Sequence, residues 1–191
     1  KINCYNYSDS CTFKITINFI MLDLHNYIRE IPNFPKEGIQ FKDITPLLQS
    51  PEAMKTAVSQ LLELIGDVKI DKVVAIESRG FLFGMLLAEK LNAGFVPIRK
   101  PGKLPGETFS EIYELEYGKD TLEIHSDALK KGEKVILHDD VLATGGTART
   151  ACNLVKKMGA EIVQCNFLIE LLFLNGRNKL NSYEVASLLK Y

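Results

Sequence analysis

The chain has 191 residues, of which 46% are hydrophobic and 25% are charged, and its formal net charge is -1. This size and composition predict one globular domain with a buried core. The nearly balanced charge argues against a protein that binds nucleic acid or an anionic membrane through its overall field, so neither is expected as a partner. No apolar run approaches the roughly 20 residues that cross a bilayer.

The first part of the chain differs from the rest. Residues 1–20 are rich in Asn, Ser and Thr, and they carry neither a secretory signal pattern nor the periodicity that follows. We expect a poorly ordered extension, or upstream sequence, ahead of a single domain over residues 21–191. Four cysteines are too few for a disulfide framework, so Cys152 and Cys165 are expected to be buried free thiols in a cytoplasmic protein.

From Leu22 onward, apolar periodicity predicts alternating helices and strands. Leu24, Ile28 and Ile31 lie at helical spacing and predict a helix that ends before Pro32, whereas residues 32–46 hold three prolines and predict a loop. Further helices are expected from Pro51 and over residues 80–92 and 147–158, strands over 72–76, 95–98, 134–138 and 161–170, and an antiparallel hairpin around 109–124. This order predicts an α/β domain on a mostly parallel sheet.

The most informative segment is residues 135–147, where a buried strand leads through two acids into a turn of small residues and then a helix. Free backbone N–H groups at a helix start, the helix dipole and the hydroxyls of Thr144 and Thr147 would suit a phosphate monoester. Carboxylates repel phosphate, so Asp139 and Asp140 are expected to accept hydrogen bonds from the vicinal hydroxyls of a ribose. The segment matches neither the Walker A pattern nor the dinucleotide fingerprint.

Residues 135–147 resemble the motif that binds 5-phosphoribosyl 1-diphosphate (PRPP) in the type I phosphoribosyltransferases. Four further segments are similar to the adenine phosphoribosyltransferases of that family: VAIESRGFLFG at 74–84, PIRKPGKLPG at 97–106, LEYG at 115–118, and the stretch around Phe34-Pro35 and residues 38–44. The similarity runs from about Leu22 to Tyr191. It implies the type I phosphoribosyltransferase fold, a mostly parallel central sheet flanked by helices, with a small N-terminal hood (about 22–46) and a flexible loop (about 100–117).

The resemblance also implies a reaction, in which adenine and PRPP give AMP and diphosphate in purine salvage. It implies a homodimer and a need for Mg²⁺, held mainly by PRPP and water with no direct protein ligand. The PRPP- and AMP-binding residues that it implies are Asp139, Asp140, Ala143, Thr144, Gly145, Gly146 and Thr147.

Arg79 follows a tight turn at the end of a buried strand and opens a helix, a poor position for a cation unless it binds an anion. The resemblance implies a cis peptide at Glu77-Ser78 and pyrophosphate binding in this region. Lys103, with Arg99 or Lys100, is expected to reach the pyrophosphate, either within one subunit or across a dimer interface. The implied pyrophosphate-binding residues are Ser78, Arg79, Arg99, Lys100 and Lys103. The implied catalytic residues are Arg79, Lys103 and Glu116, with Tyr117 helping to seal the closed loop.

Adenine is flat and weakly polar, so its site should offer apolar faces and main-chain groups that read its edge. Phe41 and Val141 are the expected faces, and the resemblance assigns the reading groups to the main chain around Gln40 and Lys42. His138 replaces the family's usual aliphatic residue. We expect it to be partly buried and hydrogen-bonded, and a charge gained there at acidic pH would lower activity.

Two alternatives remain open from the sequence alone. One is a phosphoribosyltransferase for another purine such as xanthine, because base preference depends on the hood. The other is a regulator that senses PRPP without catalysis. Such a regulator would need a DNA-binding segment, and residues 1–20 hold only Lys1 and Lys14 as basic residues and no helix-turn-helix pattern.

Overall fold

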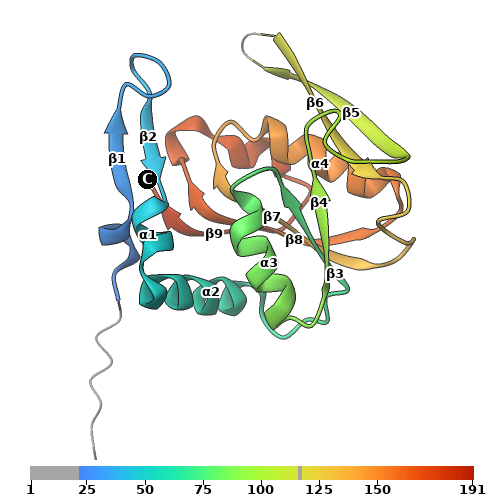
Figure 1. Ribbon diagram of the computed structural model, residues 1–191, viewed down its shortest axis with the longest axis horizontal. Coiled ribbons are helices and arrows are strands. Elements are labelled where there is room, and N and C mark those ends of the chain that lie inside the picture. Colours follow the sequence, from blue (N-terminus) through green and yellow to red (C-terminus); the bar gives the residue numbers. More distant parts are fainter. Residues whose placement is uncertain (1–21, 116–117) are drawn as a thin grey trace, which may run out of the picture.

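A five-stranded parallel sheet forms the centre of the computed structural model, which describes residues 22–115 and 118–191 (Figure 1). The strand order is β4-β3-β7-β8-β9, and every neighbouring pair is parallel. The strands are β3 (Lys72–Ile76), β4 (Gly94–Ile98), β7 (Lys134–Leu142), β8 (Glu161–Glu170) and β9 (Val185–Lys190). The expected fold class, a mostly parallel sheet with flanking helices, is confirmed.

Helices cover both faces of this sheet, and the strand sequences show why. Successive residues of a strand point to opposite faces. Val73 therefore packs in one core cluster with α2 (Pro51–Ile65) and α3 (Gly80–Lys90), whereas Val74 packs in a second cluster with α4 (Gly146–Lys157). A strand that is buried on both faces needs an uninterrupted apolar run, as the segment Val-Val-Ala-Ile in β3 provides.

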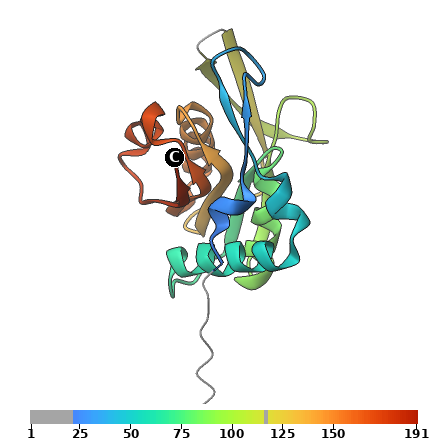
Figure 2. The ribbon, with the colours of Figure 1, turned by 90° about the vertical axis from the view of Figure 1, so that its left-hand side faces the viewer.

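Two antiparallel hairpins project from the same side of the molecule (Figures 1 and 2). One joins β1 (Arg29–Pro32) to β2 (Gln40–Asp43) and continues into the short helix α1 (Thr45–Gln49). The other joins β5 (Thr108–Leu115) to β6 (Gly118–His125), as expected from the sequence. The carboxyl ends of β3 and β7 lie between the two hairpins (Figure 1).

The hood differs from the sequence expectation. The prediction of a helix that carries Leu24, Ile28 and Ile31 is wrong. Only Leu24–Tyr27 is helical, as a short 3-10 helix, and strand β1 follows it. The loop expected over residues 32–46 contains β2. Pairing across the hairpin overrides the helical spacing. Arg29 lies opposite Asp43 in the register, and its Nε donates to Asp43 Oδ2 at 2.9 Å.

The other expected elements form within a few residues of their expected limits. Strand β9 and the 3-10 helices η2 (Leu172–Leu174) and η3 (Gly176–Leu180) were not expected. Cys152 and Cys165 are buried free thiols, as expected, with their Sγ atoms 3.6 Å apart. In the part of the chain that the structure describes, no helix is long and apolar enough to span a membrane.

Candidate active site

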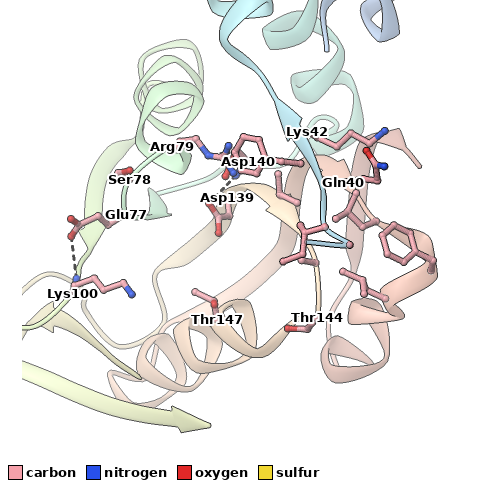
Figure 3. Close-up of a pocket in the computed structure, with 18 residues that line it drawn as sticks. Gln40, Lys42, Glu77, Ser78, Arg79, Lys100, Asp139, Asp140, Thr144 and Thr147 are labelled. Carbon is pink, nitrogen blue, oxygen red and sulfur yellow. Dashed lines mark hydrogen bonds and ion pairs between the residues drawn. The ribbon is translucent and has the colours of Figure 1, made fainter. Parts of the chain in front are cut away.

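A cavity of about 800 Å³ lies at the carboxyl ends of β3, β7 and β8, and the hood covers one side of it (Figure 3). Strand order explains its position. The connection from β3 to β4 runs through α3 on one face of the sheet, and the connection from β7 to β8 runs through α4 on the other face. The two connections therefore diverge between the neighbouring strands β3 and β7. Ligands of open α/β sheets bind at such a switch point.

Asp139 and Asp140, here called the acid pair, lie in the last part of β7 and line the cavity. Asp140 is 5% exposed, and its Oδ2 lies 2.8 Å from Nε of Arg79. Burial raises the pKa of both carboxyl groups, and the charge of Asp140 raises the pKa of Asp139 further. The Arg79 guanidinium also lies 4.8 Å above the ring of Phe41, so Arg79 connects the acid pair to the hood.

The glycine turn, residues 143–147, connects β7 to α4 and forms the floor of the cavity. Thr144 and Thr147 both line the cavity (Figure 3). Gly145 is the N-cap of α4 with φ 76°, and no described side chain caps this helix end. The backbone N–H groups there can therefore bind an anion. A Cβ on Gly145 would overlap the carbonyl oxygen of Gly176, so the two backbones pack together without room for a side chain.

On the opposite side, the turn after β3 contributes Ser78 and Arg79 to the cavity, and Glu77-Ser78 is a cis peptide, as the resemblance implied. Glu77 Oε2 accepts hydrogen bonds from Nε of Arg99 at 3.0 Å and from the backbone N–H of Lys100 at 3.1 Å. Lys100 lines the cavity. The side chain of Arg99 is instead held by Glu77, so it does not line the cavity.

The third side of the cavity is apolar. Phe41 of β2 and Val141 of β7 line it, and the ring of Phe34 meets Phe41 edge-on with centroids 5.0 Å apart. The polar residues Gln40 and Lys42 of β2 also line the cavity. The Lys42 ammonium pairs with Glu30 and lies 3.7 Å above the centre of the Tyr191 ring, so protein groups already engage this side chain. The main chain of the hood and the exposed Gln40 side chain remain as groups that can contact a ligand.

Most of the expected site residues therefore meet in one cavity. Twelve of them line it: Gln40, Phe41, Lys42, Ser78, Arg79, Lys100, Asp139, Asp140, Val141, Ala143, Thr144 and Thr147. Gly145 and Gly146 lie just behind the lining, at the start of α4. Arg99 and Lys103 are outside it, joined by a hydrogen bond from Nη1 of Arg99 to the Lys103 carbonyl. Glu116 and Tyr117 lie outside the described residues.

Six lining residues were missed by the sequence analysis: Gly38, Ile39, Glu77, Leu171, Phe173 and Leu174. The last three follow the carboxyl end of β8 directly. Because the carboxyl ends of parallel strands share one edge of the sheet, the prediction of β8 could have located them. Gly38, Ile39 and Glu77 were not named as site residues, although they lie in the segments 38–44 and 74–84 whose family similarity had been noted.

His138 was expected to be partly buried, but the structure shows that it is fully buried. Its Nδ1 lies 3.0 Å from Asn166 Oδ1, and burial lowers the pKa of the imidazole to about 4. The ring therefore stays neutral at moderately acidic pH, so the expectation that His138 gains a charge is wrong in that range.

This burial makes stability depend on pH. In the unfolded chain His138 binds a proton near pH 6.5, but in the folded chain only near pH 4. Acidification from pH 7 to 4.5 therefore favours unfolding, and this histidine should account for about 2–3 kcal/mol of the loss. Urea unfolding at both pH values should show a loss smaller by that amount in His138→Gln. Equal losses in the two proteins would contradict the prediction.

Comparison with known proteins agrees with this geometry. Residues 42–186 match the model of the phosphoribosyl transferase domain. The chain belongs to the phosphoribosyltransferase family. It is 64% identical over 170 residues to the adenine phosphoribosyltransferase of Christiangramia forsetii, covering 89% of this chain and 99% of that protein. It is 61% identical to that of Flavobacterium johnsoniae, covering 89% of this chain and 100% of that protein.

Solved structures show the same likeness. The adenine phosphoribosyltransferase of Thermoanaerobacter pseudethanolicus superposes with a TM-score of 0.86 at 51% identity, over 88% of this chain and 98% of that one. The Saccharomyces cerevisiae enzyme, in complex with an imino-altritol bisphosphate and adenine, gives a TM-score of 0.82 at 47% identity, over 86% and 96%. The reaction expected from the sequence is confirmed at this level: adenine phosphoribosyl transfer, which forms AMP and diphosphate.

Proposed function

We propose that the cavity is the active site of this transfer. The acid pair accepts hydrogen bonds from the two ribose hydroxyls of PRPP, and the glycine turn binds the 5-phosphate. The proposal rests on one observation: Asp139 and Asp140 line the same cavity as Thr144 and Thr147. Carboxylates accept hydrogen bonds, whereas the free N–H groups of a helix start donate them to an anion. A phosphorylated ribose suits both, because it carries a diol and a phosphate.

Catalysis in this site is mainly positioning and charge stabilisation. The bond from the anomeric carbon to diphosphate breaks, the ribose gains oxocarbenium character, and adenine attacks the opposite face with inversion. Ser78, Arg79 and Lys100 bind the departing diphosphate, whose charge grows as the bond breaks. No covalent enzyme intermediate is needed. From the family resemblance, Lys103 and Arg99 add positive charge, and Glu116 handles the proton of the purine.

The base lies between Phe41 and Val141, with main-chain groups near Gln40 and Lys42 reading its edge. Phe173 and Leu174 line the same cavity. We further propose that the loop that begins at Lys100 closes over the bound substrates. Closure would exclude water, which would otherwise hydrolyse PRPP.

Mg²⁺ fits this site as an ion that arrives with PRPP. The cavity offers the carboxylates of the acid pair and that of Glu77, which Arg99 holds, and residues 22–115 and 118–191 contain no group of three His, Cys, Asp or Glu side chains that could cage a metal. Mg²⁺ ordinarily keeps waters and substrate oxygens as ligands. When bound, it would neutralise charge on the diphosphate while Arg79 and Lys100 contact the remaining oxygens.

A homodimer in the cytoplasm is the form that we propose for the enzyme. Leu82, Met85 and Leu86 of α3 are 45%, 52% and 38% exposed and lie at i, i+3 and i+4 on one helix face. A second copy of the chain would cover them. Sedimentation equilibrium should give the mass of a dimer, and a monomer at micromolar concentration would contradict this proposal. The buried free thiols Cys152 and Cys165 support a reducing compartment.

A base panel tests the function. The purified protein is mixed with PRPP, Mg²⁺ and either adenine, hypoxanthine, guanine or xanthine, and nucleotide formation is followed. We expect AMP from adenine, at least 100-fold less product from the other bases, and no AMP when a chelator removes Mg²⁺. Product from xanthine alone would favour the alternative purine. PRPP binding without product from any base would favour a sensor.

A further inference from the structure

A buried carboxylate at the end of β8 anchors the segment that follows the sheet. Glu170 is 3% exposed. Its Oε1 accepts from Nε of Arg177 at 2.9 Å, and its Oε2 accepts from Nη2 of Arg177 at 2.6 Å. Nη1 of Arg177 also donates to the Val185 carbonyl at 2.7 Å, and the Ser187 hydroxyl donates to Glu170 Oε2. Arg177 of η3 is thus tied to both β8 and β9.

The ion pair between Glu170 and Arg177 joins the two ends of a short segment of the chain. Residues 171–176, here called the wall segment, connect the two partners, and Leu171, Phe173 and Leu174 of this segment line the cavity. Phe173 and Leu174 are nevertheless 65% and 36% exposed. Packing against the core therefore constrains these two side chains little, and their positions depend on the backbone of the wall segment. That backbone is held by hydrogen bonds from Leu171 to Leu142 and from Leu172 to Tyr191, and by the ion pair at its ends.

The far end of the wall segment supports the glycine turn. A Cβ on Gly176 would overlap the Ala143 carbonyl oxygen and lie 2.9 Å from the backbone nitrogen of Gly145. Gly176 is the residue directly before Arg177. The ion pair between Arg177 and Glu170 is therefore one residue away from the backbone that packs behind the glycine turn.

We propose that Arg177 is a positioning residue that holds two parts of the active site in place, the wall segment and the glycine turn. This inference rests on the proposed function. Through Glu170 it holds Phe173 and Leu174 at the base side of the cavity and Gly176 against the glycine turn. Arg177 itself does not line the cavity. Its effect should therefore appear in the binding of both substrates more than in the chemical step.

Steady-state kinetics of Arg177→Gln test this inference. We expect KM for adenine and KM for PRPP to rise about 10-fold each while kcat changes less than about 3-fold, because displaced groups bind the ground state less well. Calorimetric titration with PRPP should show a matching rise in Kd. Arg177→Lys should lie between the wild type and Arg177→Gln, because an ammonium lacks the planar fork that binds both carboxylate oxygens.

Two further variants separate positioning from stability. The double variant Glu170→Gln/Arg177→Gln removes the ion pair without leaving a buried charge, so it should fold even if Arg177→Gln does not. We expect it to show the same rise in both KM values. Val58→Ala removes core volume in α2, in the cluster on the α2–α3 face of the sheet, and should lower the melting temperature without changing either KM.

The outcomes are distinct. Wild-type KM values in folded Arg177 variants, or an equal rise in Val58→Ala, would overturn the inference and leave Arg177 a purely structural residue. A wild-type protein that forms no AMP from adenine would instead overturn the proposed function. In that case the calorimetric Kd for PRPP in the same variants still tests whether Arg177 positions the glycine turn.

Discussion

Replacing Asp139 and Asp140 together by asparagine should lower kcat/KM for PRPP about 10³-fold. The two side chains keep their size but lose the charge that strengthens hydrogen bonds from the ribose hydroxyls. Each charge-assisted hydrogen bond is worth about 1.5–3 kcal/mol, so the loss of two gives this magnitude. The double variant also loses the ion pair between Asp140 and Arg79, and with it the link from the acid pair through Arg79 to Phe41 of the hood.

The same carboxylates should destabilise the folded chain at neutral pH. Burial and mutual repulsion raise the pKa of Asp139, so the folded state binds more protons than the unfolded state above the usual value of 3.8. Stability from this group falls as pH rises through that window. We therefore expect Asp139→Asn alone to raise the melting temperature at pH 7.5 by a few degrees, on the order of 1 kcal/mol, while it lowers activity.

Thermal unfolding and kinetics measured on one preparation test both effects. Asp67→Asn is the matched control, because Asp67 is an exposed carboxylate in the turn between α2 and β3, and it should change neither quantity. A double variant that keeps kcat/KM within 10-fold of the wild type would show that the acid pair does not hold the ribose. A lower melting temperature in Asp139→Asn would contradict the stability argument.

The acid pair and the glycine turn could be predicted because their determinants are contiguous. A buried strand, two acids, two glycines and a helix follow one another along residues 135–147, and each local preference agrees with the fold. The edge of the sheet could be predicted too, since strands such as β3 are continuous apolar runs. Local sequence therefore identifies the part of the cavity for which we propose ribose phosphate binding.

The rest of the site depends on partners far away in the sequence. Ile28 and Ile31 have helical spacing, but β1 forms because β2 pairs with it and Asp43 accepts from Arg29. Phe173 lines the cavity although it follows β8 in a segment without apolar periodicity, and the contacts that hold this segment come from β7, Arg177 and the C-terminal residue Tyr191. Likewise, the burial of His138 follows from the packing of neighbouring elements around β7, which the sequence of β7 alone does not show.

Replacing Gly145 by alanine should damage both stability and PRPP binding. Its φ of 76° is unfavourable for a residue with a Cβ, and that Cβ would overlap the Gly176 carbonyl oxygen. Left-handed strain costs about 1–2 kcal/mol, and the overlap forces a backbone shift, so we expect a loss of about 3–5 kcal/mol. The melting temperature should fall by about 10 °C, and kcat/KM for PRPP by at least about 100-fold, since a shift of about 1 Å misplaces the phosphate donors.

Gly132→Ala separates the strain from the overlap. Gly132 has a similar φ of 83°, in the turn before β7, but a Cβ there would meet nothing within 4 Å. We expect this variant to lose only about 1–2 kcal/mol and to keep its KM for PRPP, because strain alone acts there. If Gly145→Ala and Gly132→Ala lose equal stability and both keep KM, the packing of Gly176 against the glycine turn has no functional consequence. A loss of PRPP affinity confined to Gly145→Ala would instead connect that packing to the binding of the 5-phosphate.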